Sequence, residues 1–137
     1  MIFVYVNIFN VASLEKGVPC ITYNCVDCCI ETEMNLTKDD ISRIEDAGYK
    51  SLDFVLTKEG ESFLRNVNGR CSFLTNSGCS IYHLKPEGCC LYPLVYCEEN
   101  NSVFLDPLCP HKEEFKIEKR DIQKMLKTMK KLYEEKS

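Results

Sequence analysis

Residues 71–93, with the sequence CSFLTNSGCSIYHLKPEGCCLYP, decide how the chain is organised. Four cysteines fall in this stretch, and they are separated by Gly, Pro, Asn and Ser. These residue types mark turns rather than a long helix or strand, and successive turns can point several sulfurs inward. A second group lies upstream and comprises Cys20, Cys25, Cys28 and Cys29. A fold that brings the two groups together would surround one centre with thiolates, so the sequence predicts a metal or iron–sulfur site.

Cysteine content is the strongest compositional signal, with 10 cysteines in 137 residues. A chain of this length is expected to form one domain, residues 1–137, with an ordinary hydrophobic core that needs no disulfide staples. Disulfides in a secreted protein are the competing explanation. The N-terminal run MIFVYVNIFN has no Lys or Arg before its apolar residues and no clear cleavage site, so it is not a signal peptide. We therefore expect a cytoplasmic protein with reduced thiols.

Charge and motifs exclude several other classes of function. The net charge of −4 offers no electrostatic footprint for nucleic acid. The N-terminal apolar run is shorter than the roughly 20 residues that span a bilayer, so we expect a buried or edge strand there and no membrane partner. Phosphate-binding loops, zinc-protease helices and nucleophile elbows are absent from the sequence.

Local patterns predict an α+β fold. Thr37 and Asp40 have the spacing of a helix N-cap and its reciprocal partner, and Gly48 can end that helix. Asn68-Gly69 predicts a hairpin between Phe63-Leu64 and a strand over 71–74. A second hairpin is expected from 91–96 and 103–105, and an amphipathic helix over about 119–135. Its expected apolar stripe comprises Ile122, Met125, Leu126, Met129, Leu132 and Tyr133.

Several of these motifs, in this order, resemble the YkgJ-type cysteine-cluster family, a zinc- or iron-chelating domain of the CxxCxxCC type. The matching segments lie within about residues 19–111 and comprise Cys25, Cys28 and Cys29, LTKDD at 36–40, CSFL at 71–74, CSIY at 79–82, and Pro86, Cys89, Tyr92 and Pro93. The chain departs from the family pattern at Cys20, which is four residues from Cys25 rather than two. It also departs at Lys85 and Cys90, where the family has arginines. Metal chelation is what the resemblance implies.

The candidate ligands outnumber the needs of one four-ligand site. We expect most of the ligands among Cys25, Cys28, Cys71, Cys79 and Cys89, followed by Cys29, with Cys20 and Cys109 in reserve. His111 is a weaker candidate, and Cys97 is expected to be structural. Thiolates suit both zinc and iron–sulfur clusters, so the cofactor is one of these two. The surplus leaves open a second site, resolving thiols or core cysteines, and it leaves the roles of Cys29 and Cys90 open.

Three functions follow from such a centre. The first is a metal-binding protein that holds an iron–sulfur cluster or zinc and serves in redox chemistry or electron transfer. The second is a structural zinc module that binds a protein partner. The third is a metal-dependent protein-modifying enzyme, which would need an open coordination position beside a pocket.

Overall fold

The computed structural model describes residues 12–13, 29–110 and 112–136, and within them the fold is α+β, as predicted. The α-helices are α2 (Lys38–Asp46), α3 (Ser51–Phe54), α4 (Glu87–Leu91) and α5 (Lys119–Glu135), and the 3₁₀ turns are η2 (Tyr82–Leu84) and η3 (Lys112–Glu114). The N-terminal apolar run, residues 1–10, lies outside the described residues.

The strands of the described chain form two-stranded ladders rather than one large sheet. Four are antiparallel hairpins: β2 (Val55–Lys58) with β3 (Glu61–Leu64), β4 (Asn66–Val67) with β5 (Arg70–Cys71), β6 (Leu74–Thr75) with β7 (Gly78–Cys79), and β8 (Leu94–Cys97) with β9 (Ser102–Leu105). The fifth ladder is parallel and pairs β1 (Ala12–Ser13) with β10 (Phe115–Lys116). In a fold built of such small ladders, functional side chains are expected on the loops between them.

The Asn68-Gly69 hairpin is confirmed, although its strands differ from those predicted. Asn68 and Gly69 have φ angles of 53° and 76°, which suit the tight turn between β4 and β5. Phe63 pairs instead with Leu56 in the β2–β3 hairpin, which the sequence analysis missed. That hairpin turns at Glu59 and Gly60, also with positive φ, and a Glu-Gly pair is a weaker turn signal than Asn-Gly. The strand expected over 71–74 is interrupted, because β5 ends at Cys71 and β6 begins at Leu74.

The predicted capping of α2 is confirmed. The Thr37 side chain accepts a hydrogen bond from the Asp40 amide at 3.0 Å, and the Thr37 amide donates to Asp40 Oδ2 at 2.9 Å. Gly48, just beyond the helix, has a φ of 102°, which an L side chain rarely adopts. These interactions satisfy amides that the first helical turn would otherwise leave without partners.

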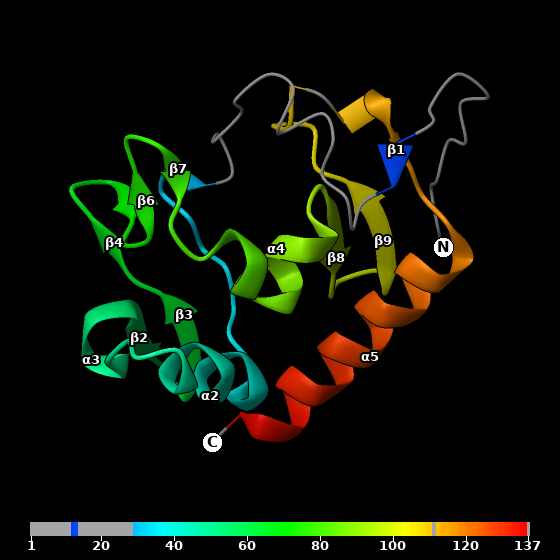
Figure 1. The fold of residues 1–137 in the computed structure, drawn as a ribbon. Helices are drawn as coiled ribbons and strands as arrows, with labels where there is room; N and C mark the ends of the chain where they lie inside the picture. The colour runs from blue at the N-terminus through cyan, green and yellow to red at the C-terminus, as the bar shows by residue number, and fades with distance from the viewer. Residues whose placement is uncertain (1–11, 14–28, 111, 137) are drawn as a thin grey trace.

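Helix α5 has the predicted bounds, and its C-terminal part contacts the start of α2. Figure 1 shows it running along one side of the molecule, from the region of β8 and β9 to α2. Its last turn holds the start of α2, where the Lys38 amide donates to Glu135 Oε1 at 2.8 Å and Lys131 pairs with Asp39. Two residues of the predicted apolar stripe are exposed instead, Leu126 at 45% and Tyr133 at 81%, because Met125 at the centre of the stripe faces the core.

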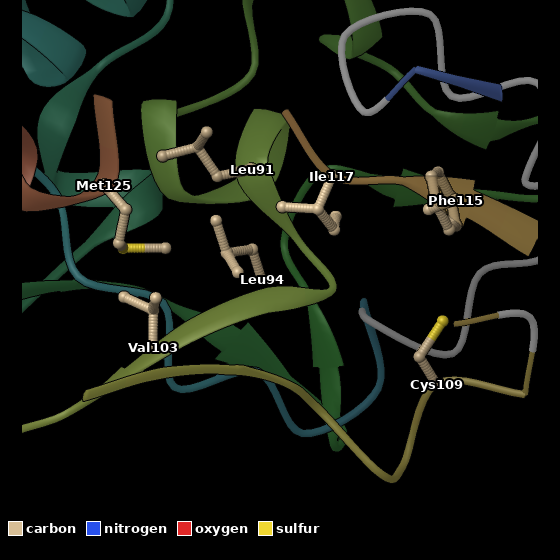
Figure 2. Close-up of a cluster of buried hydrophobic side chains, with 7 residues drawn as sticks. All are labelled: Leu91, Leu94, Val103, Cys109, Phe115, Ile117 and Met125. Carbon is tan, nitrogen blue, oxygen red and sulfur yellow. The ribbon is translucent and has the colours of Figure 1, made fainter. Parts of the chain in front are cut away.

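Buried side chains form two hydrophobic clusters. The first cluster joins α4, the β8–β9 hairpin and α5, and comprises Leu91, Leu94, Val103, Cys109, Phe115, Ile117 and Met125 (Figure 2). The second cluster joins α2, α3 and the first three hairpins, and comprises Leu36, Ile44, Phe54, Leu64, Cys71, Phe73 and Ile81. Helix α4 follows the second cluster in sequence and contributes Leu91 to the first, so it lies where the two clusters meet.

None of the helices in the described ranges has the length and apolar character needed to cross a bilayer.

We expect Leu94→Ala to lower the free energy of unfolding by about 2–5 kcal/mol, since the side chain is buried and its removal leaves a cavity. Leu108→Ala is the matched control, because Leu94 is 1% exposed whereas Leu108 is 81% exposed. The control should change the free energy of unfolding by no more than about 0.5 kcal/mol. Urea unfolding of the reduced chain, followed by circular dichroism, measures both; equal losses would show that the first cluster does not support the fold.

Candidate metal centre

Four of the predicted ligands meet at the second hydrophobic cluster. Cys71 is buried within it, and Cys29, Cys79 and Cys89 are partly buried and pack against it. They come from four separate parts of the chain: the segment before α2, strand β5, strand β7 and helix α4. The structure therefore gathers sulfurs that lie up to sixty residues apart in the sequence, Cys29 to Cys89.

Cys29 and Cys71 are brought together by backbone pairing. Ile30 forms an antiparallel bridge with Arg70, and the Glu31 amide donates to the Gly69 carbonyl at 2.7 Å. Cys29 precedes Ile30 and Cys71 follows Arg70, so in an antiparallel register the two cysteines lie on the same side of the bridge.

Cys79 is placed by the tight β6–β7 hairpin, in which it pairs with Leu74. Gly78 has a φ of 102°, and the Thr75 hydroxyl donates to the Gly78 carbonyl at 2.8 Å. One residue further on, the Ser80 amide donates to the Phe73 carbonyl at 2.8 Å. These bonds fold the chain back so that Cys79 returns to the cluster that holds Cys71.

Cys89 lies on α4, a helical turn that the sequence analysis did not predict. Pro86 and Gly88 were expected to bend the chain, but Pro86 is instead the N-cap of this helix and Gly88 lies within it. A proline is compatible with a helix start because it has no N–H that would need a partner. A Cβ at Gly88 would lie 2.3 Å from Met34 Sδ, so a larger residue there would displace the flexible Met34 side chain.

Helix α2 holds the start of α4. The Glu87 amide donates to Asp40 Oδ1 at 3.0 Å. Arg43 Nη2 donates to the same carboxylate oxygen at 3.0 Å and to the Lys85 carbonyl at 3.0 Å. The role of Arg43 has no signal in the sequence, because an arginine on a helix surface is ordinary. Asp40 was predicted only as a capping residue.

Cys90 faces different surroundings from its neighbour. Its Sγ donates to the Lys85 carbonyl at 3.8 Å, a hydrogen bond that requires a protonated thiol. Burial raises the pKa of Cys90 above its ordinary value of 9.0, while the positive charge of Lys85 opposes that rise. Cys90 therefore acts as a neutral hydrogen-bond donor to the Lys85 carbonyl.

The remaining candidates lie elsewhere. Cys109 is buried in the first cluster and lies away from Leu94 and Met125 in Figure 2. Cys97, which was expected to be structural, lies in β8 and pairs with Ser102. Cys20, Cys25, Cys28 and His111 fall outside the described residues. No disulfide joins any two of the cysteines that the structure describes.

The described cysteines do not by themselves complete a metal site. Within residues 12–13, 29–110 and 112–136, no group of three His, Cys, Asp or Glu side chains is close enough to hold an ion. Their chemistry nevertheless suits a thiophilic metal, because sulfur donors in apolar surroundings are typical of zinc and iron–sulfur sites.

Tyr82 is a further polar group near these residues. The Lys85 ammonium lies 3.9 Å from the centre of its ring, a cation–π contact. Its hydroxyl is buried and has no hydrogen-bond partner within the described part of the chain. Lys85 thus contacts Tyr82 through its side chain and Cys90 and Arg43 through its carbonyl.

The chain matches a known protein family. A family model named CxxCxxCC, described as a putative zinc- or iron-chelating domain, matches residues 19–116. Searches of curated proteins and of solved structures found no match. The matched range includes all four cysteines of the second cluster, together with Cys20, Cys25, Cys28 and Cys109.

We expect Cys90 in the folded chain to react with iodoacetamide more slowly than Cys90 in the unfolded chain at about pH 8, since only the thiolate reacts. Because its folded pKa is raised, the thiol stabilises the fold below pH 9.0, and this contribution is lost as the pH rises through the folded pKa. Lys85→Met should slow the reaction further, since it removes the charge that favours the thiolate. Mass spectrometry of the labelled peptides tests both, and faster labelling of the Lys85 variant would contradict this reading.

Proposed function

Because this chain belongs to the CxxCxxCC family, whose model covers residues 19–116, we propose that its cysteine thiolates hold an iron–sulfur cluster or a zinc ion. The observation that carries the proposal is the meeting of Cys29, Cys71, Cys79 and Cys89 at one hydrophobic cluster. Apolar packing normally excludes water, so deprotonated thiols there need a metal to balance their charge.

The remaining ligands of the proposed metal come from the segment just before Cys29. Since the described residues hold no complete three-ligand group, the proposed site needs donors from elsewhere in the chain. Cys25 and Cys28 have the two-residue gap that lets both sulfurs reach one ion, and Cys28 adjoins Cys29 in sequence. The proposed ligands are therefore Cys25, Cys28, Cys29, Cys71, Cys79 and Cys89. Cys20 and Cys109 remain candidates for the same site or for a second one.

An iron–sulfur centre is the first candidate, and it would supply one-electron chemistry for redox or electron transfer. Ligands that come from separate loops with wide sequence spacing support this assignment, since zinc sites more often pair two short knuckles. A structural zinc site that serves a protein partner is the second candidate, because thiolates on separate loops can also converge on zinc. Either centre fits a cytoplasmic protein with reduced thiols.

The deciding measurement is metal and acid-labile sulfide analysis, with an absorption spectrum, of the full chain purified without oxygen or added metal. Iron with sulfide and a brown colour would establish an iron–sulfur protein. Zinc in a colourless sample would establish the second candidate and remove the redox function. A fully reduced protein without either metal would overturn the proposal.

Cys79→Ser should lose most of the bound metal, since serine replaces a soft thiolate with a neutral hydroxyl. The variant should also be less stable, because metal-binding free energy adds to folding free energy. Cys97→Ser is the matched control, since Cys97 is partly buried like Cys79 but belongs to neither hydrophobic cluster. Metal content per chain and thermal unfolding measure the two effects. Unchanged metal in the Cys79 variant would remove Cys79 from the ligand set.

A further inference from the structure

We propose that Asp40 and Arg43, on α2, are positioning residues that set the place of the Cys89 sulfur relative to Cys29 and Cys71. The inference rests on the thiolate centre proposed above, and it identifies what holds one of the ligands in place. Both residues lie outside the set of cysteines: Asp40 accepts from the Glu87 amide of α4, and Arg43 donates to a carbonyl just before that helix.

Asp40 makes more bonds than a capping residue needs. Its Oδ2 accepts from the Thr37 amide and completes the capping box of α2. Asp121 makes the same bond in the capping box of α5, where its Oδ2 accepts from the Glu118 amide at 2.8 Å. The two aspartates are almost equally buried, at 1% and 2% exposure. Among the residues that the structure describes, Asp40 also uses its second oxygen on another element, where it accepts the Glu87 amide of α4.

Helix α4 depends on this hydrogen bond to Asp40. It has five residues, and its N-cap, Pro86, offers no side-chain hydrogen bond to the first helical amides. A helix this short is not stable by itself, because forming the first turn costs more than one hydrogen bond returns. The carboxylate of Asp40 supplies the missing acceptor at the first amide, that of Glu87, two residues before Cys89.

Arg43 holds the approach to α4. Its Nη2 donates to the Lys85 carbonyl at 3.0 Å, to the Leu84 carbonyl at 3.4 Å and to Asp40 Oδ1. The guanidinium therefore balances the buried charge of Asp40 and fixes the two peptide groups that precede Pro86. Together, the two side chains attach residues 84–87 to α2.

The chain that leads into α2 also positions Cys29 and Cys71. Cys29 lies beside the bridge to Arg70, next to Cys71. Between Cys29 and α2, the chain is tied to β3, since the Leu64 amide donates to the Met34 carbonyl at 2.9 Å. Met34 also packs against Gly88. Residues 29–43 thus form one continuous segment. Its first residues include Cys29 and bridge to the strand of Cys71, and its last residues, on α2, hold the helix that carries Cys89.

The test compares variants of the metal-free full chain, each titrated with Co²⁺ in the absence of oxygen. Co²⁺ affinity and the sulfur-to-cobalt charge-transfer bands report how many thiolates bind and in what geometry. Asp40→Asn and Arg43→Gln are the test variants. Asp121→Asn and Arg120→Gln are the matched controls, since Asp121 makes the equivalent local capping bond in α5 and Arg120 pairs with Glu118 on the surface.

Asp40→Asn and Arg43→Gln should each weaken Co²⁺ binding by about tenfold or more, the usual effect of losing a partner that orients a ligand. Both should also alter the charge-transfer bands. Asp121→Asn should lose similar stability, because it breaks an equivalent capping box, yet keep the affinity and the bands of the original chain. Equal Co²⁺ affinity and identical bands in all five proteins would overturn the inference. Arg43→Gln keeps the α2 capping box intact, so it decides the question if Asp40→Asn does not fold.

A readout without metal separates this inference from the proposed function. Amide hydrogen exchange at residues 87–91 of the metal-free chain should become faster in Arg43→Gln and Asp40→Asn, and should be unchanged in both controls. If the original chain binds no Co²⁺, the proposed metal centre fails, and the exchange at α4 still shows whether the two residues hold Cys89. Unchanged exchange at α4 in both test variants would show that they do not.

Discussion

The buried carboxylate of Asp40 is the interaction on which the arrangement of the cysteines depends. It receives the Thr37 amide from its own helix, the Glu87 amide from α4 and a guanidinium from Arg43. An ionised carboxylate is costly to bury without such partners. The hydrogen bonds satisfy both of its oxygens, so the charge that would oppose folding instead joins two helices that are distant in sequence.

Local signals predicted the elements whose causes are local. The capping box of Thr37 and Asp40, the Asn68-Gly69 turn and the C-terminal helix each depend on residues a few positions apart, and the structure has all three. Helix α4 was missed because a single turn has no periodicity to detect. Its stability comes from Asp40, which is 47 residues away. The division of the core into two clusters was missed for the same reason, since it depends on which hairpins pack together.

The candidate site was predictable in its chemistry and less so in its geometry. Cysteine spacing pointed to Cys29, Cys71, Cys79 and Cys89 among others, and the structure brings these four to one cluster. Spacing could not distinguish Cys89 from its neighbour Cys90, because the two separate only when α4 forms and turns one thiol toward Lys85. Nor could it place Cys109 in the other cluster. Whether Cys20, Cys25 and Cys28 join the site stays a prediction.

The contact between the C-terminal part of α5 and the start of α2 bears on the expected order of assembly. Glu135 meets the start of α2 across 97 residues, whereas Asp40 and Glu87 meet across 47. During synthesis, the α2–α4 junction can form as soon as α4 has left the ribosome, before α5 itself has emerged. Contacts between residues that are far apart in sequence close the largest loops. Their entropic cost is therefore the highest, and they are expected to form last. The part of the chain from Cys29 to α4 is therefore expected to fold before α5 docks onto it.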